Sequence, residues 1–251
     1  MSGHSKWSTI KHGKAATDGR RSKLFTRLTR EIIAAASQGG SDTESNFRLR
    51  MAVQRAKDNN MPNDNVDRAI KRATGEGADG IQLSEATYEG HGPGGTAILL
   101  QTLTDNRNRT VSEVRSTFNK AGGSLSEAGS VAWQFQSRGV ITIEADEEQV
   151  DDLTLTAIDA GAEDFESFDS TLSIYSAPES LEQLRITLAE HGAQIKTSEL
   201  SMVATNMMPL DEKAAMSALR LLDQLEELDD VQKVFSNADF PDEVLERYGN
   251  E

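Results

Sequence analysis

The sequence predicts an α+β protein, in which an N-terminal helical domain is followed by two α/β domains of the ferredoxin-like type, one inserted in the other. Apolar residues recur at helical spacing up to about residue 77, and β-rich runs alternate with amphipathic segments after it. Residues 139–203 form a complete βαββαβ series by themselves. We therefore expect three domains, over residues 1–79, over residues 80–137 together with 204–251, and over residues 138–203.

Three helices are expected in the first domain. The first carries Leu24, Leu28 and Ile32 at four-residue spacing. Gly39-Gly40 ends it, because glycine readily takes the left-handed conformation of a helix C-terminus. The other two helices, with the residues expected in register on one face, are 44–59 (Phe47, Met51, Ala52, Arg55 and Ala56) and 63–74 (Val66, Ala69, Ile70 and Ala73).

Short strands and one helix are expected between residues 80 and 137. The helix begins at Thr110 in this interpretation, because Thr110-Val-Ser-Glu113 has the form of a capping box, in which the hydroxyl and the carboxylate bind free amides of the helix start. The sequence GHGPGG is expected to be a hairpin turn rather than a phosphate loop, because it lacks the Lys-Ser/Thr pair and the following helix. The other elements expected here are strands at 86–89, 96–104 and 130–135, with Gly122-Gly123 ending the helix.

The remaining elements predict the insertion. The series in the middle of the chain consists of strands at 139–145, 164–168, 171–175 and 194–203 and helices at 146–160 and 178–191. The segment before it lacks a second helix, and the C-terminal segment supplies one at 211–227, followed by a strand at 231–235. We therefore expect the segments on either side of the insertion to share one domain.

The composition excludes several classes of protein. The 251 residues include no cysteine, which excludes disulfides and thiolate-based zinc or redox sites. No apolar run approaches the ~20 residues that a membrane helix needs, and the N-terminus lacks the apolar core of a secretory signal. We expect a cytoplasmic protein that has no contact with a membrane.

Charge is distributed unevenly along the chain. Residues 1–77 contain 15 Lys and Arg and 8 Asp and Glu, a formal charge of +7, whereas residues 78–251 contain 11 and 33, a charge of −22. Such an asymmetry indicates a nucleic-acid-binding segment attached to a body that repels phosphate. The alternative is a solvated surface whose charge is merely uneven.

The basic N-terminus supplies most of the expected contacts to nucleic acid. Lysine and arginine neutralise phosphates and release counterions, and Trp7 offers an aromatic face for a base. In the alternative interpretation, Trp7 packs on the helical domain and the cations only keep the protein soluble. The contact residues expected in the first domain are Lys6, Trp7, Lys11, His12, Lys14, Arg20, Arg21, Lys23, Arg27, Arg30, Arg68, Lys71 and Arg72.

Two further arginines are candidates in the motif TDNRNRT. Arg107 and Arg109 stand just before the expected helix start, where guanidinium groups and free backbone amides together favour an anion. The Asp and Asn residues of the same motif are also good turn and cap residues, so turn chemistry is an equal alternative.

The sequence contains no constellation typical of an enzyme. Its four histidines lack metal-ligand spacing to one another, and His91 lies in the expected hairpin turn. Carboxylate pairs such as Asp229-Asp230 are common in an acidic chain and carry no information by themselves. We expect no catalytic residue, no bound metal and no cofactor.

Seven segments resemble the YebC-like family, and they keep the family's order and spacing from residue 3 to about residue 237. They are GHSKW at 3–7, Asp18 with Arg21-Ser-Lys23-Leu-Phe25, MPNDNVDRAIKRATGEG at 61–77, YEGHGPGG at 88–95, TDNRNRTVSEVR at 104–115, GGSLSEAGSVAWQF at 122–135 and LDDVQKVFSN at 228–237. The resemblance implies an N-terminal helical domain and two α/β domains, one inserted in the other.

The family comprises bacterial proteins called probable transcriptional regulatory proteins, among them the quorum-sensing repressor PmpR, and a mitochondrial branch that acts as a translational activator of cytochrome c oxidase. The resemblance therefore implies a non-enzymatic regulatory factor that binds nucleic acid, first as a DNA-binding transcriptional regulator. One alternative is a translation factor that binds RNA or the ribosome. Another, from a different class, is an enzyme or adaptor that uses the acidic α/β surface. No oligomeric state is assigned.

Overall fold

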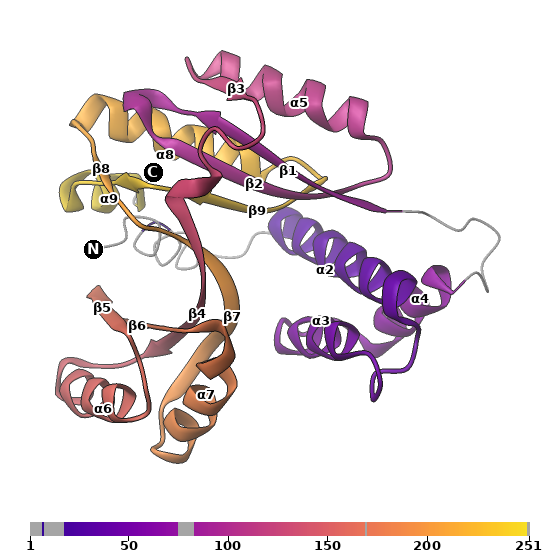
Figure 1. Ribbon diagram of the computed structural model, residues 1–251, viewed down its shortest axis with the longest axis vertical. Helices are drawn as coiled ribbons and strands as arrows, with labels where there is room; N and C mark the ends of the chain where they lie inside the picture. Colours follow the sequence, from indigo (N-terminus) through magenta and orange to yellow (C-terminus); the bar gives the residue numbers. More distant parts are fainter. Residues whose placement is uncertain (1–6, 8–17, 75–82, 169, 250–251) are drawn as a thin grey trace.

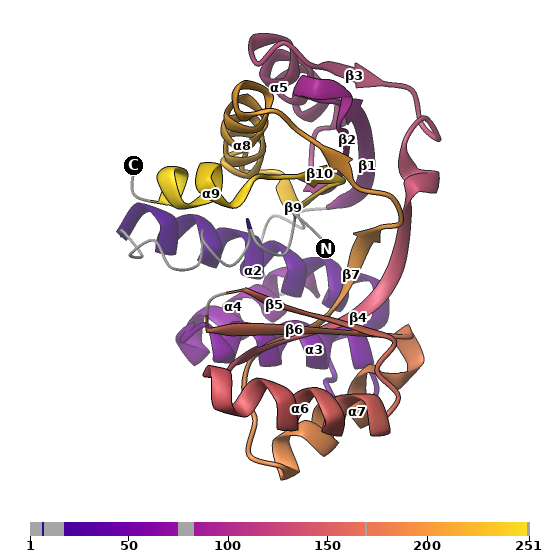
Figure 2. The same ribbon diagram turned by 90° about the vertical axis from the view of Figure 1, so that its left-hand side faces the viewer.

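The computed structural model describes residues 7, 18–74, 83–168 and 170–249, and it has the expected α+β architecture (Figure 1). Helices near the N-terminus precede two four-stranded antiparallel sheets. The two sheets follow one another along the long axis of the molecule, and the N-terminal helices lie beside them (Figures 1 and 2). These helices are α2 (Asp18–Gly39), α3 (Phe47–Asp58) and α4 (Asn63–Ala73).

The core of the helical domain lies between α2 and the two helices that follow it. Leu28 of α2, Leu49 of α3 and Val66 of α4 share one cluster and are at most 4% exposed. The predicted register of α3 is confirmed for Ala52 and Ala56 but wrong for Phe47 and Met51, which are 66% and 41% exposed. The buried residues of α3 are Leu49, Ala52 and Ala56. The two alanines are small and let α3 approach α2, so the larger Phe and Met side chains face outward.

The first sheet has the strand order β3-β1-β2-β9, and every neighbouring pair in it is antiparallel. Its strands are β1 (Ser84–His91), β2 (Ala97–Thr104), β3 (Ser124–Ser126) and β9 (Val231–Ser236). The predicted hairpin turn between β1 and β2 is confirmed, and Gly94 and Gly95 have positive φ angles there, in the short helix η1 (Pro93–Gly95). Strand β9 follows the second sheet in the chain and nevertheless pairs with β2.

Helices cover one face of this sheet (Figure 2). They are α5 (Arg107–Lys120), α8 (Glu212–Glu226) and α9 (Asp242–Gly249). Their apolar side chains form one core with the sheet, in which Phe118 of α5 and Leu222 of α8 share a cluster with Leu100 of β2. This core fixes the orientation of α5, and therefore of the arginines at its start.

Helix α5 begins at a different residue from the one predicted. Its cap is Asn106, whose side-chain oxygen accepts a hydrogen bond from the backbone N–H of Arg109 at 3.1 Å. Thr110, the predicted cap, lies one turn inside the helix and is 1% exposed. Its hydroxyl donates to the carboxylate of Asp230 at 2.7 Å, a partner 120 residues away that no local capping pattern reveals.

The segment predicted as a strand at 130–135 is also different. It forms the short helix η2 (Ala132–Gln134) and joins the next strand only at its last residue. The cause is Glu89, which is 5% exposed on β1. Its carboxylate accepts hydrogen bonds at 2.6–2.8 Å from the backbone N–H groups of Gly129, Val131 and Ala132. Three amides that converge on one carboxylate bend the segment away from an extended course.

The second sheet has the order β5-β6-β4-β7 and is antiparallel, with two helices on one face (Figure 2). Strand β6 lies between β4 and β5, as in the split βαβ arrangement of ferredoxin-like folds. The elements are β4 (Phe135–Glu144), α6 (Glu147–Asp159), β5 (Asp164–Phe168), β6 (Thr171–Ser176), α7 (Leu181–Glu190) and β7 (Gln194–Ala204), and a separate parallel pair consists of β8 (Met208–Pro209) and β10 (Ala238–Asp239). The domain boundaries at residues 79, 137 and 203 remain a prediction.

Candidate nucleic-acid interface

The predicted contact residues fall into groups that differ in what they touch. Lys6, Lys11, His12 and Lys14 lie outside the described residues, and so does the side chain of Arg20. Of the others, Trp7 is buried, five cations bond to distant parts of the chain, and four are exposed without an acidic partner among the described residues.

Trp7 is 2% exposed and belongs to the core of the first sheet. That core also contains Leu219 and Leu222 of α8 and Phe240, which precedes α9. The indole therefore has no open face for a base in this structure, contrary to the predicted stacking contact. It also packs with the first sheet, whereas the alternative interpretation placed it on the helical domain.

The cations in the first half of α2 contact the last residue of α8 and the segment that joins α8 to β9. Lys23 forms an ion pair with the carboxylate of Glu227, and Arg27 donates to the backbone carbonyl of Glu226. Burial lowers the pKa of Arg27, although the carboxylates of Glu227 and Asp229 act in the opposite direction. The guanidinium nevertheless stays charged, because arginine is not deprotonated in proteins. These side chains hold the helical domain against the first sheet.

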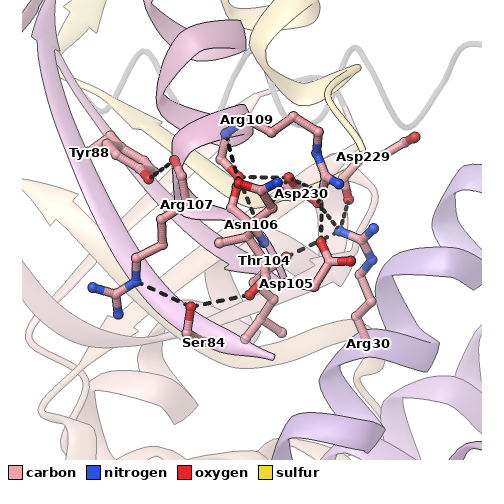
Figure 3. Close-up of polar contacts among 12 residues, drawn as sticks. Arg30, Ser84, Tyr88, Thr104, Asp105, Asn106, Arg107, Arg109, Asp229 and Asp230 are labelled. Atoms are coloured by element: carbon pink, nitrogen blue, oxygen red, sulfur yellow. Dashed lines mark hydrogen bonds and ion pairs between the residues drawn. The ribbon is translucent and has the colours of Figure 1, made fainter. Parts of the chain in front are cut away.

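Arg30 completes this contact (Figure 3). Its guanidinium donates to the backbone carbonyls of Leu103, at 3.1 Å, and of Asp229, at 3.0 Å. It also forms an ion pair with the carboxylate of Asp230. One arginine therefore joins helix α2 both to the end of β2 and to the start of β9.

Asp230 is the centre of the polar network in Figure 3 and is 1% exposed. Arg109 donates to its Oδ2 at 2.8 Å, and the hydroxyls of Thr110 and Thr104 donate to the same oxygen at 2.7 and 3.2 Å. Burial alone would raise the pKa of this carboxyl, but the hydrogen bonds from Arg109, Thr110 and Arg30 outweigh it and hold the pKa at about 2. The carboxylate is therefore ionised at neutral pH, bound by one arginine from α2 and one from α5.

Arg107 is also held within the chain. Its Nε donates to the hydroxyl of Ser84 at 3.2 Å, and its Nη2 donates to the backbone carbonyl of Glu85 at 2.9 Å. Both arginines of the TDNRNRT motif thus have internal partners, and the buried anion beside Arg109 is Asp230. An external anion at this helix start remains a prediction.

Helix α4 presents a basic face to solvent. Arg68, Lys71 and Arg72 are exposed, and Lys71 and Arg72 follow Arg68 by three and four residues, so the three share one side of the helix. None of the three forms an ion pair or a side-chain hydrogen bond with another described residue. Arg21 of α2 is exposed as well, and its guanidinium lies 5.4 Å from the ring centroid of Phe25. These four are the predicted contacts that the described structure leaves open to a ligand.

The outward side of α3 carries an apolar pair that the sequence predicted to be buried. Phe47 and Met51 are exposed, and the guanidinium of Arg50 lies 5.3 Å from the ring centroid of Phe47. Arg50 is fixed there because it donates to the backbone carbonyls of Thr43 and Glu44 at 3.1 and 3.0 Å. An exposed ring beside a cation is suited to an unpaired base, and helical periodicity gave no signal for it.

Sequence reasoning missed the two buried carboxylates, Glu89 and Asp230, that organise the loops of this region. Both stand in segments that carry the family resemblance, YEGHGPGG and LDDVQKVFSN. Their place in these motifs was the signal that could have identified them, because most other acids of the chain lie outside such specific motifs.

The described part of the chain contains no group of three or more His, Asp or Glu side chains that could hold a metal ion. No helix in that part combines the length and the apolar character of a membrane span.

Comparison with known proteins covers nearly the whole chain. Residues 5–76 match the family described as "TACO1/YebC protein N-terminal domain", and residues 83–238 match "TACO1/YebC second and third domain". A probable transcriptional regulatory protein of Dehalococcoides mccartyi strain BAV1 is 53% identical over 248 residues, which cover 99% of this chain and 98% of that protein.

Two further relatives agree in length. A probable transcriptional regulatory protein of Natranaerobius thermophilus is 49% identical over 249 residues, which cover 98% of this chain and 99% of that protein. The crystal structure of a conserved hypothetical protein of Aquifex aeolicus is similar with a TM-score of 0.82 and 42% identity, covering 91% of this chain and 94% of that chain. The chain therefore belongs to the TACO1/YebC family.

Proposed function

We propose that this chain is a non-enzymatic regulatory protein of the cytoplasm, which binds nucleic acid through its N-terminal helical domain and acts as a DNA-binding regulator of transcription. The names of its relatives, probable transcriptional regulatory proteins, support the regulatory role. The charge supports the choice of surface, because residues 78–251 carry −22 and repel phosphate, whereas residues 1–77 carry +7.

The observation that carries the proposal is the basic face of α4. Arg68, Lys71 and Arg72 have no acidic partner among the described residues, although the chain contains 41 Asp and Glu. Three unpaired cations on one side of a helix are placed to neutralise phosphates, and arginine binds a phosphate through two parallel hydrogen bonds. Lys23, Arg27 and Arg30, the docked cations of α2, already have partners within the chain and should contribute little to nucleic-acid affinity.

The connection between α3 and α4 supports duplex DNA as the ligand. Residues 59–62 join the two helices, and Asn60 takes a left-handed conformation with a φ of 57°. A turn of three or four residues between two helices is typical of helix-turn-helix proteins, whose second helix enters the major groove. By this analogy α4 is the helix that meets DNA, and its cations contact the phosphates.

The test is the combined substitution of Arg68, Lys71 and Arg72 by alanine. With mixed-sequence duplex DNA, the slope of log affinity against log salt should become shallower by roughly 2.7, since each phosphate contact contributes about 0.9. The matched control removes the same charge from the acidic body, at Lys196, Lys213 and Arg247, and should keep the wild-type slope. Equal slopes for the wild type and the α4 variant would refute α4 as the contact surface.

A second candidate, RNA in the context of the ribosome, is favoured by the exposed side of α3. Phe47, with Arg50 and Met51 beside it, forms a stacking surface for unpaired bases, which single-stranded RNA offers and intact duplex DNA does not. Phe47→Ala should weaken binding of single-stranded RNA by about 1–3 kcal/mol and leave duplex binding unchanged. Leu155→Ala, at a position 63% exposed on α6, is the matched control. RNA binding that is unaffected by Phe47→Ala would remove this candidate.

A further inference from the structure

Helix α5 lies at the end of the molecule away from α3 (Figure 1). Its solvent-exposed face is polar and basic. Five exposed side chains line a shallow hollow of ≈ 450 Å³ along it, those of Ser112, Arg115, Ser116, Asn119 and Lys120. Their spacing places them on one side of the helix, facing away from the buried Val114 and Phe118. The packing of α5 on the sheet therefore fixes this face toward solvent.

The two cations of this face differ from their surroundings. Residues 78–251 contain 33 acidic and 11 basic residues, yet Arg115 and Lys120 bond to no carboxylate among the described residues. Most other cations of this part of the chain do have one, in the pairs Arg109–Asp230, Arg138–Glu163, Arg185–Glu182, Lys196–Glu144, Lys233–Glu199 and Arg247–Glu212. Helix α5 itself contains a single acid, Glu113, so it is locally basic within an acidic body.

The side chains of this face suit the sugar–phosphate backbone of a nucleic acid. Arg115 offers two parallel N–H donors to a phosphate, and Lys120 offers a compact charge. The two serine hydroxyls and the amide of Asn119 are further donors of the kind that contact phosphate oxygens. The face carries no aromatic ring, so its contacts do not depend on the base sequence. It extends over about 12 Å, which corresponds to about three phosphates of one duplex strand.

We propose that this face of α5 is a second contact for the phosphate backbone of nucleic acid, in addition to the basic face of α4. The proposal rests on the nucleic-acid binding proposed above and adds a site on the acidic part of the chain. Because α4 and α5 lie on different parts of the surface, they contact different stretches of the ligand (Figure 1). Local positive charge at α5 lets the ligand pass close to a body that otherwise repels it.

The test compares Lys120→Glu with Lys213→Glu. Both lysines are exposed, neither has an acidic partner among the described residues, and both substitutions change the charge by the same amount, so overall repulsion is matched. Lys213 lies on α8 and does not line the hollow. Binding is measured by fluorescence anisotropy across a salt series, with mixed-sequence duplex DNA and with single-stranded RNA of the same length. Thermal unfolding should show that both variants are folded, with Lys120→Glu slightly less stable because it places an acid in the last turn of α5.

Lys120→Glu should bind nucleic acid on the order of tenfold more weakly than Lys213→Glu at low salt. The double variant Arg115→Ala with Lys120→Ala should reduce the slope of log affinity against log salt by about 1.8 on duplex DNA or about 1.4 on RNA. The nucleic acid that shows the effect identifies the ligand. Equal binding by the two glutamate variants, while the α4 substitutions still weaken binding, would overturn the α5 contact alone. A wild-type protein that binds neither nucleic acid would overturn the proposed function and this contact with it.

Discussion

Helices α2 and α4 belong to the same basic domain, but their cations are used differently. The cations of α2 that bond to the first-sheet region are Lys23, Arg27 and Arg30. The cations of α4 that bond to no described acid are Arg68, Lys71 and Arg72. The net charge of a segment therefore does not measure the charge that the segment offers to a ligand. Part of the positive charge neutralises the acidic body, and the rest is available.

The docked helix also determines where the free helix points. Helices α2 and α4 share the core of the helical domain, in which Leu28 and Val66 are buried. When Arg30 fixes α2 on Asp230, it fixes α4 at the same time, because the core joins the two helices rigidly. The unpaired face of α4 is thus held in one direction relative to the acidic sheets, and like charge penalises other approaches of a nucleic acid.

Asp230→Ala breaks the contact between α2 and the first sheet and should cause the largest loss of folding stability. It removes the carboxylate that accepts hydrogen bonds from the buried hydroxyls of Thr104 and Thr110. It also leaves Arg30 and Arg109 without their shared counter-ion. Loss of one partner from a buried ion pair costs about 3–5 kcal/mol, and because both arginines are partly exposed we expect about 3 kcal/mol. Urea unfolding measures this loss of stability.

Asp229→Ala is the control for that substitution. The Asp229 side chain is exposed, and Arg30 binds only its backbone carbonyl, so the loss should be below about 0.5 kcal/mol. If both variants unfolded at the same urea concentration, Asp230 would not be the centre of the docking contact.

Low pH should weaken the contact between α2 and the first sheet by protonating Asp230. The expected loss of stability is smaller than for Asp230→Ala. The pKa of Asp230 is about 2 in the folded protein, below the ordinary value of 3.8, so the unfolded chain takes up the proton at a higher pH. The stabilisation, roughly 2 kcal/mol, is fully present above about pH 4 and is lost as the pH falls through about 2. Urea unfolding between about pH 5 and pH 2 should show this loss in the wild type and not in Asp230→Asn. A stability difference between the two proteins that is constant over this range would contradict the assignment.

Local signals in the sequence predict most of the elements but not their outward faces. The helix expected at 211–227 is observed as α8, because its apolar stripe and its cap, Asp211, lie within the element itself. In α3 the apolar residues allow two overlapping stripes, and periodicity does not decide which of them is covered. Packing against α2 selects the stripe with two alanines and leaves Phe47 and Met51 in solvent.

The candidate interface shows the same limit more strongly. The sequence identifies the basic residues as a class but not their partners, since Arg30 and its partner Asp230 are 200 residues apart. Asp229 and Asp230 are adjacent acids of the same type, and only the fold makes one exposed and the other buried. Trp7 likewise stands among cations in the sequence and packs in the core of a distant sheet. The tertiary structure therefore decides which cations have internal partners and which are available to a ligand.

The smallest effect is expected when docked cations are removed. Lys23→Ala with Arg27→Ala deletes two positive charges that already bond to the α8–β9 segment, so the salt slope for nucleic-acid binding should equal that of the wild type. The α4 substitutions, by contrast, should reduce the slope by roughly 2.7. Stability should fall only by about 1 kcal/mol, because the Lys23–Glu227 pair is largely exposed and such pairs contribute little.

The opposite outcome would change the comparison itself. If the Lys23 and Arg27 substitutions reduced the salt slope as much as those on α4, these side chains would have to exchange Glu227 and the Glu226 carbonyl for phosphates when the ligand binds. The domain would then leave the first sheet on binding, since Arg30 and Asp230 could not keep their contact while α2 moves away. In that case Asp230→Ala should raise nucleic-acid affinity, because it removes the competing internal anion. If Lys23, Arg27 and Arg30 instead keep their internal partners when the ligand binds, Asp230→Ala should leave the affinity of the folded protein unchanged. The cations of α2 would then serve to attach the domain, and those of α4 to bind nucleic acid.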